Sequence, residues 1–203
     1  MSGRQIFMAG RPREFDRDAA LRKARDLFWE RGFEGVSMSE LVAELGLASA
    51  RIYAAFGSKE SLFREAVMLY EEKEGAFADR ALSDIEPISK AIERLFLDAI
   101  DLYTRKGAPR GCMVVSSATN CSAENLPVQE WLASHRRIRT ASIVYRIQKA
   151  VRAGELPVET DANSLGDLYA TALHGISVQA RDGVNKKRLL AMLPALLRLL
   201  EPR

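Results

Sequence analysis

Apolar side chains recur every three or four residues along nearly the whole chain, and no segment alternates apolar and polar residues as a half-buried strand does. This spacing fits the turn of about 3.6 residues in an α-helix, so each helix should bury one apolar stripe. The chain of 203 residues is long enough for one domain or two small ones. Its 47% hydrophobic and 28% charged residues are typical of a folded globular protein. The sequence therefore predicts an all-α fold.

Two short helices joined by a glycine turn are the most specific local feature. Ser37 and Glu40 form a capping box, in which each side chain satisfies a backbone N–H at the start of a helix. That helix ends at Gly46, and a second short helix follows over about residues 49–56. With a longer helix over about residues 17–31 before them, they predict a three-helix unit of the helix-turn-helix type.

The pattern around these helices resembles the TetR family of transcriptional regulators, from Arg11 to about Tyr70. Two residues depart from the family pattern: Ala48 stands where a serine usually caps the recognition helix, and Ala55 replaces a frequent His or Tyr. The resemblance implies a DNA-binding dimer that joins through a four-helix bundle of its last long helices. The matching residues are Ala20, Leu27-Phe28, Gly32-Phe33, Ser37, Leu41-Val42, Leu45-Gly46-Leu47, Ile52-Tyr53, Phe56 and Ser58-Lys59-Glu60-Ser61-Leu62.

The outer face of the helix over residues 49–56 is the expected DNA-reading surface. If Ile52 and Phe56 point inward, four side chains face a major groove, and Arg51 among them is suited to a guanine. Tyr53 can instead pack half-buried, and Ser37 can serve only as a cap. We expect DNA contacts from Ser37, Ser39, Ser49, Ala50, Arg51, Tyr53, Lys59, Arg11 and Arg13, the last two on a basic arm that tracks phosphates or a minor groove.

After the helix over residues 58–75 the sequence predicts further helices over about 87–105, 112–120, 127–153, 161–182 and from 185 onward. Pro194 should bend or break the last one, whose leucines lie on more than one side. Such a helix needs cover, either from a second subunit or from the chain's own core. We expect a homodimer interface made of Leu168, Ala172, Ile176, Leu189, Leu193, Leu196 and Leu200.

The middle helices place polar groups among apolar ones, as a small-molecule cavity requires. Each of these residues can alternatively belong to the core. The candidate effector-binding residues are Phe96, Ile100, Tyr103, Met113, Ser117, Trp131, His135, Tyr169 and His174. We accordingly divide the chain into a flexible basic arm (1–15), a helix-turn-helix domain (16–57) and a helical effector-binding and dimerisation domain (58–203) that begins with a connecting helix (58–75).

Three function classes follow. The first is a dimeric repressor that binds a palindromic operator in double-stranded DNA and is released by a small molecule. The second is a thiol-based redox sensor on the same scaffold, using Cys112 or Cys121, and the third is an enzyme or carrier with an incidental helix-turn-helix. The sequence lacks the catalytic motifs, metal-ligand spacings and cofactor loops that would favour an enzyme. No signal peptide or membrane-spanning stretch is recognisable, so we expect a cytoplasmic protein with no metal, cofactor or membrane partner.

Overall fold

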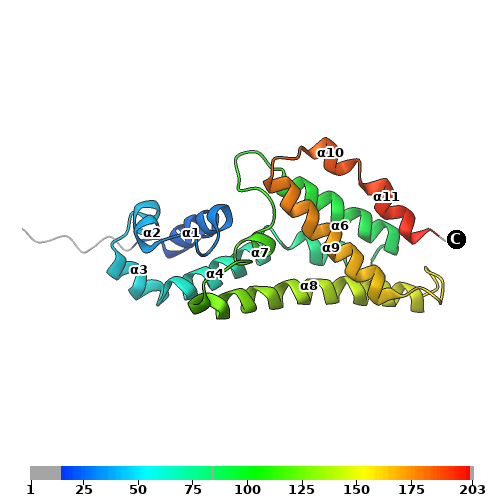
Figure 1. Cartoon of the computed structure of the whole chain (residues 1–203), viewed down its shortest axis with the longest axis horizontal. Coiled ribbons are helices and arrows are strands. Elements are labelled where there is room, and N and C mark those ends of the chain that lie inside the picture. The colour runs from blue at the N-terminus through cyan, green and yellow to red at the C-terminus, as the bar shows by residue number, and fades with distance from the viewer. Residues whose placement is uncertain (1–14, 84, 202–203) are drawn as a thin grey trace, which may run out of the picture.

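The computed structural model describes residues 15–83 and 85–201, and within these residues all regular structure is helical, as predicted (Figure 1). Helices α1, α2 and α3 form one end of the molecule, α4 leads away from them, and α8 runs beneath the remaining helices. The helices are α1 (Arg17–Arg31), α2 (Met38–Leu45), α3 (Ser49–Phe56), α4 (Lys59–Glu72), α5 (Phe77–Ala81), α6 (Ile88–Tyr103), α7 (Met113–Ser116), α8 (Leu126–Arg152), α9 (Ala162–Arg181), α10 (Lys186–Leu190) and α11 (Leu193–Leu197), with 3-10 turns η1 (Ala123–Asn125) and η2 (Arg198–Leu200).

Side-chain caps explain where most of the long helices begin. Asp16, Ser58, Asp161 and Asn185 each accept a hydrogen bond from a backbone N–H in the first turn of the following helix. The capping box of α2 forms as expected, with Ser37 and Glu40 satisfying each other's backbone donors. Such caps stabilise a helix by about 1 kcal/mol each, so these helix starts are encoded locally.

Aromatic side chains form the core of the three-helix end and join it to α4. Phe28 of α1 packs edge-on against Phe63 of α4, with ring centroids 5.2 Å apart, and Phe33 lies 5.1 Å from the same ring. Ile52 and Phe56 of α3 are buried in this core, as the sequence predicted. Helices α1, α2 and α3 thus share one buried core with α4.

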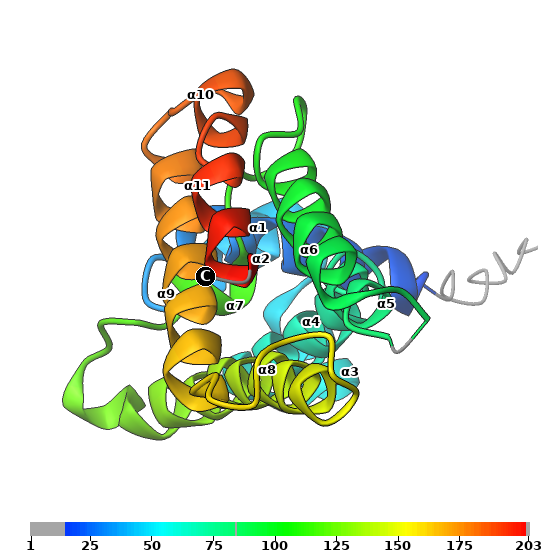
Figure 2. The same ribbon diagram turned by 90° about the vertical axis from the view of Figure 1, so that its right-hand side faces the viewer.

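Helices α6, α8 and α9 build the larger half, and α10 and α11 lie across α6 and α9 (Figure 2). The predicted last helix is broken at Ala191 and Met192, between α10 and α11, because Pro194 in the first turn of α11 lacks the N–H that would donate to the Leu190 carbonyl and continue α10. The predicted helix over 112–120 is reduced to the single turn of α7, and α5 was not predicted from the sequence pattern.

Candidate DNA-binding surface and cavity

The outer face of α3 carries the predicted reading residues into solvent. Ser49, Ala50 and Arg51 are exposed, and 48% of Tyr53 is exposed, so about half of the Tyr53 surface remains available to a partner. Ala48 gives α3 no side-chain cap, which leaves N–H donors in the first turn open to another acceptor. The surface therefore offers a guanidinium, a phenol, hydroxyls and free backbone donors side by side.

Arg17 holds α3 in place, a role that the sequence did not reveal. Its guanidinium donates two hydrogen bonds to the carbonyl of Ala55, at 3.3 and 3.2 Å, and pairs with Glu65 of α4 at 2.8 Å. It also lies 4.4 Å from the centre of the Phe56 ring. One side chain of α1 thereby connects the C-terminal end of α3 to α4.

The other predicted phosphate contacts have varied surroundings. Ser37 and Ser39 are exposed, and their hydroxyls lie 2.9 Å apart at the start of α2. Lys59 is only partly exposed because its ammonium lies 4.3 Å from the centre of the Phe33 ring. Burial lowers the pKa of Lys59, against the attraction of Glu34 and Glu40. Arg11 and Arg13 lie outside the described residues, so the basic arm stays a prediction.

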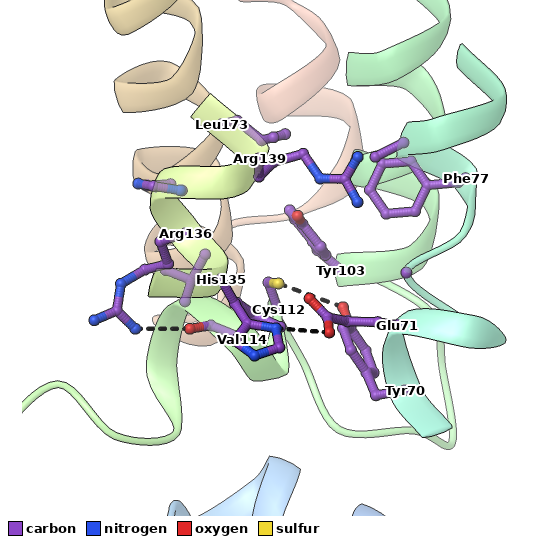
Figure 3. A pocket seen from close by; sticks show the side chains of 14 residues that line it. Tyr70, Glu71, Phe77, Tyr103, Cys112, Val114, His135, Arg136, Arg139 and Leu173 are labelled. Atoms are coloured by element: carbon purple, nitrogen blue, oxygen red, sulfur yellow. Dashed lines mark hydrogen bonds and ion pairs between the residues drawn. The ribbon is translucent and has the colours of Figure 1, made fainter. Parts of the chain in front are cut away.

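A cavity of about 40 Å³ lies in the larger half, between the C-terminal end of α4 and helices α6, α7, α8 and α9 (Figure 3). Apolar side chains form part of its wall and titratable groups converge from several sides. It is lined by Tyr70, Glu71, Gly75, Phe77, Ala78, Tyr103, Cys112, Val114, Val115, His135, Arg136, Arg139, Leu173 and His174.

Two tyrosines and a thiol form the most buried polar group of this cavity. The Tyr70 hydroxyl donates to the Cys112 Sγ at 3.4 Å, and Tyr103 lies close to the same sulfur. Burial, followed by the neighbouring Cys112, raises the pKa of both tyrosines well above the usual value. These hydroxyls therefore stay protonated. Tyr70 can donate to a bound molecule only by giving up its hydrogen bond to Cys112.

Histidines and arginines from α8 and α9 contribute the other titratable groups of the cavity wall. His135 Nδ1 lies 2.8 Å from a carboxylate oxygen of Glu71, which joins α8 to the end of α4. Arg136 donates to the Val114 carbonyl at 2.9 Å and so fixes α7 against α8. Burial lowers the pKa of His174, and the charge of Arg136 lowers it further. The wall can thus present both charged and neutral polar groups to a ligand.

Comparison with known proteins identifies the scaffold. Residues 20–66 match the bacterial regulatory proteins of the tetR family, and residues 72–193 match the tetracyclin repressor-like C-terminal domain. The chain belongs to the TetR family. Among solved structures, it is similar to a cysteine mutant of the TetR family transcriptional regulator CifR complexed with 26bp double-strand operator DNA, with a TM-score of 0.88 and 38% identity over 93% of this chain and 98% of that one.

Two curated relatives from Escherichia coli (strain K12) also match this TetR-family chain over most of their length. The HTH-type transcriptional repressor ComR is 30% identical over 191 residues, which cover 94% of this chain and 91% of ComR. The HTH-type transcriptional repressor BdcR is 28% identical over 190 residues, which cover 93% of this chain and 90% of BdcR. The similarity therefore includes both halves of the molecule.

The TetR-family cavity contains only part of the set predicted to bind an effector. Tyr103, His135 and His174 line it. Six predicted residues do not line it: Phe96, Ile100, Met113, Ser117, Trp131 and Tyr169. Phe96, Ile100, Met113 and Tyr169 pack in the core. Ser117 donates to the Phe28 carbonyl, and Trp131 makes edge contacts with the rings of Phe63 and His135. The sequence missed Tyr70, Glu71, Cys112, Arg136 and Arg139, because a helical stripe does not show which helices, distant in sequence, converge on one space.

The predicted dimer residues separate into two groups. Ile176, Leu189, Leu193 and Leu200 are buried within this single chain, which corrects their assignment to a subunit interface: α10 and α11 cover α6 and α9 of their own chain. Leu168 remains 47% exposed, and Ala172 and Leu196 are partly exposed. The prediction omitted three other exposed apolar side chains. They are Val178, on the same helix as Leu168, and Ile138 and Tyr145 on the neighbouring helix α8.

Both cysteines are free thiols. No group of three or more His, Cys, Asp or Glu side chains that could hold a metal occurs among residues 15–83 and 85–201. In the same part of the chain, no helix is long and apolar enough to cross a lipid bilayer.

Proposed function

We propose that this TetR-family protein is a homodimeric transcriptional repressor that binds a palindromic operator and is released by a small molecule in the cavity. The observation that carries the proposal is the outer face of α3, where Ser49, Arg51 and Tyr53 are exposed on a helix whose inner residues are buried. A helix of this kind fits a major groove, with base contacts near its N-terminal end. The named repressors ComR and BdcR and the operator complex of CifR support the DNA-binding part.

Dimerisation follows from the geometry of reading a palindrome and from the exposed apolar face. Two identical recognition helices must present the same surface to two half-sites, which requires a two-fold axis. Ile138 and Tyr145 on α8 and Leu168 and Val178 on α9 are exposed apolar side chains of two helices that pack together, and a second copy can cover them. We assign the subunit interface to the surface that contains these four residues. Ala172 lies on α9 between Leu168 and Val178 in the sequence.

The cavity supports a compact effector with at least one polar group. Its space of about 40 Å³ in the free chain holds a few water molecules and is far smaller than a usual ligand pocket of about 300–1,000 Å³, so a ligand larger than a few atoms must displace side chains to enter. Displacement at Glu71 or Tyr70 acts directly on the last turn of α4, which continues from the DNA-binding end. A ligand that favours one position of α4 changes the separation of the two recognition helices.

The thiol-sensor alternative receives no support from the named relatives. Burial raises the pKa of Cys121, which lowers the fraction of reactive thiolate. Cys112 is buried at the cavity wall beside Tyr70. We therefore retain the small-molecule repressor as the proposed function.

The test has two stages that use the full chain. Selection of bound DNA from a random pool should return a palindrome, and light scattering without DNA should give a dimer mass. A ligand screen should then find a compound that releases the operator. By linkage, the operator complex should bind that compound more weakly than the free dimer by about 5–150-fold. Equal affinities would exclude the allosteric mechanism, and the absence of any preferred DNA sequence would exclude the function.

A further inference from the structure

Arg181, at the end of α9, binds the C-terminal end of α1. Its Nη1 donates to the Trp29 carbonyl at 2.9 Å, and its Nη2 donates to the Glu30 carbonyl at 2.9 Å. Both carbonyls belong to the last turn of α1, where no further helical N–H follows to donate to them. A cation at this position also complements the negative end of the helix dipole. The guanidinium thus replaces the hydrogen bonds that α1 would otherwise make to water.

The chain segment around Gly111 lies between these two helices. Arg181 Nη1 reaches the Arg110 carbonyl at 3.4 Å, and the indole N–H of Trp29 donates to the Gly111 carbonyl at 3.1 Å. A Cβ on Gly111 would lie 2.7 Å from Cγ of Arg181 and 2.7 Å from the Ser177 carbonyl oxygen. Only glycine permits this approach, particularly at a φ of +73°. Helices α1 and α9 therefore hold this segment closely between them.

The same segment makes a second contact with the DNA-binding end through Ser117. The Phe33 N–H donates to the Ser117 carbonyl at 2.7 Å, and the Ser117 hydroxyl donates to the Phe28 carbonyl at 3.3 Å. A Cβ on Gly32 would lie 3.1 Å from the Ser117 carbonyl oxygen, so this contact also depends on a glycine. The connection between the two halves therefore does not run through α4 alone.

We propose that Arg181 is a positioning residue for operator binding, which fixes the angle between the three-helix end and α9. The inference rests on the proposed function, because α9 carries part of the proposed dimer surface. A rigid contact from α9 to α1 transfers the geometry of the subunit interface to the recognition helices. Arg181 touches no DNA in this role; it sets the distance between the two half-sites that the dimer accepts.

The experiment measures how strongly the dimer prefers one half-site spacing. The operator obtained by selection is compared with two derivatives, in which the half-sites are one base pair closer or farther apart, and with a duplex that holds a single half-site. The Arg181→Met variant keeps most of the aliphatic stem but removes the donors. The matched control is Arg188→Met, which changes an exposed arginine on α10.

Wild type and Arg188→Met should bind the native spacing much more tightly than either derivative. In Arg181→Met the ratio of the affinity for the native spacing to the affinity for either derivative should be about tenfold smaller than in wild type. The affinity for the single half-site should change by less than about threefold. Arg181→Lys keeps the charge but not the planar fork that reaches three carbonyls, and should recover part of the preference. It also provides a folded variant if Arg181→Met is unstable.

Two results would overturn the inference. One is a spacing preference in Arg181→Met and Arg181→Lys equal to that of wild type. The other is an equal loss of affinity for the operator, its derivatives and the single half-site together with a lower melting temperature, which indicates a purely structural role. Wild-type protein that binds no palindrome would overturn the proposed function itself, a result distinguishable from both.

Discussion

Arg51 and Lys59 are both cations at the DNA-binding end, but they differ in what surrounds them. Arg51 is exposed, and its guanidinium carbon lies 6.0 Å from the centre of the Phe15 ring, too far for a strong contact. Lys59 lies directly over Phe33 and is partly withdrawn from water. Arg51 is therefore free to reach a base edge, whereas Lys59 stays close to the domain and can at most touch a nearby phosphate.

Replacing Arg51 by alanine should cost about 1–3 kcal/mol of specific binding, because a bidentate contact to guanine is lost. The preference for one base pair of the operator should relax. Binding to a set of operators with single base-pair changes, measured with purified dimer, checks both effects.

Lys59→Ala provides the contrasting variant. It should weaken binding to all operator variants equally. The slope of log affinity against log salt concentration should fall by about one, because one phosphate contact is lost. If Arg51→Ala binds the unchanged operator as tightly as wild type, Arg51 is not the reading residue.

His174 should make the stability of the protein sensitive to acid. Its pKa is lowered in the folded chain, so below its ordinary pKa of about 6.5 the unfolded chain takes up a proton before the folded chain does. The stabilising contribution of the neutral histidine is complete above that value and declines as the pH falls toward the folded pKa. His174→Gln should flatten the profile of melting temperature between about pH 5 and 7. Equal slopes for variant and wild type would contradict this account.

At the scale of helices and loops, the chain uses one carboxylate to fix the start of α8 against the DNA-binding end. Glu34, in the turn between α1 and α2, accepts hydrogen bonds from the Ser122 N–H at 2.7 Å and from Asn125 Nδ2 at 2.9 Å. These hydrogen bonds, that from Asn125 first, lower the pKa of Glu34. The contact adds to those of Ser117 and Arg181 on the same side of α1.

Glu34→Ala should lower the free energy of unfolding by about 1 kcal/mol, because the Ser122 N–H, the Ser122 hydroxyl and Asn125 Nδ2 lose a charged acceptor at an exposed site. This loss of unfolding free energy should be greatest above pH 4.5, the ordinary pKa of the carboxyl group. It should disappear as the pH falls through the lowered pKa of Glu34 in the folded chain. Urea unfolding at pH 7 and pH 3 measures both quantities. Glu44→Ala, on the exposed side of α2, is the control.

The start and end of most helices could be predicted from sequence because local chemistry determines them. Ser37 and Glu40 form their capping box, and Pro194, in the first turn of α11, prevents α10 from continuing. Contacts between distant segments were not predictable in the same way. The leucine pattern of Leu189 and Leu193 shows that these residues are covered, but the same pattern arises whether the cover is another subunit or α6 of the same chain.

The residues of the cavity could likewise be predicted only in part. Cys112 was recognised as a candidate thiol, but nothing in its separation of 42 residues from Tyr70 predicts that the tyrosine hydroxyl reaches the sulfur. Tyr103, His135 and His174 were found because a polar group on an apolar stripe is informative by itself. Arg136 and Arg139 carry no such signal, since arginines are common on exposed helix faces.

For the whole molecule, the exposed surface on α8 and α9 leads to a test of assembly. Leu168→Glu places a charge on an apolar residue that is 47% exposed in the single chain, so it should weaken the dimer without unfolding the subunit. Leu199→Glu changes a leucine of similar exposure, 45%, outside this surface and should leave the dimer intact. Light scattering at micromolar concentration distinguishes the two. If Leu199→Glu dissociates the dimer and Leu168→Glu does not, the subunit interface lies on the C-terminal helices instead.

Helix α8 extends along the larger half of the molecule, from below α4 and α7 to the end farthest from α3 (Figure 1). Its 27 residues, at about 1.5 Å each, amount to a rod of about 40 Å. A rod of that length acts as a lever: a tilt of about 5° about one end moves the other by about 3.5 Å, close to the rise of one base pair. A rotation too small to disturb side-chain contacts near the pivot can therefore move the DNA-binding end by one full step along the double helix.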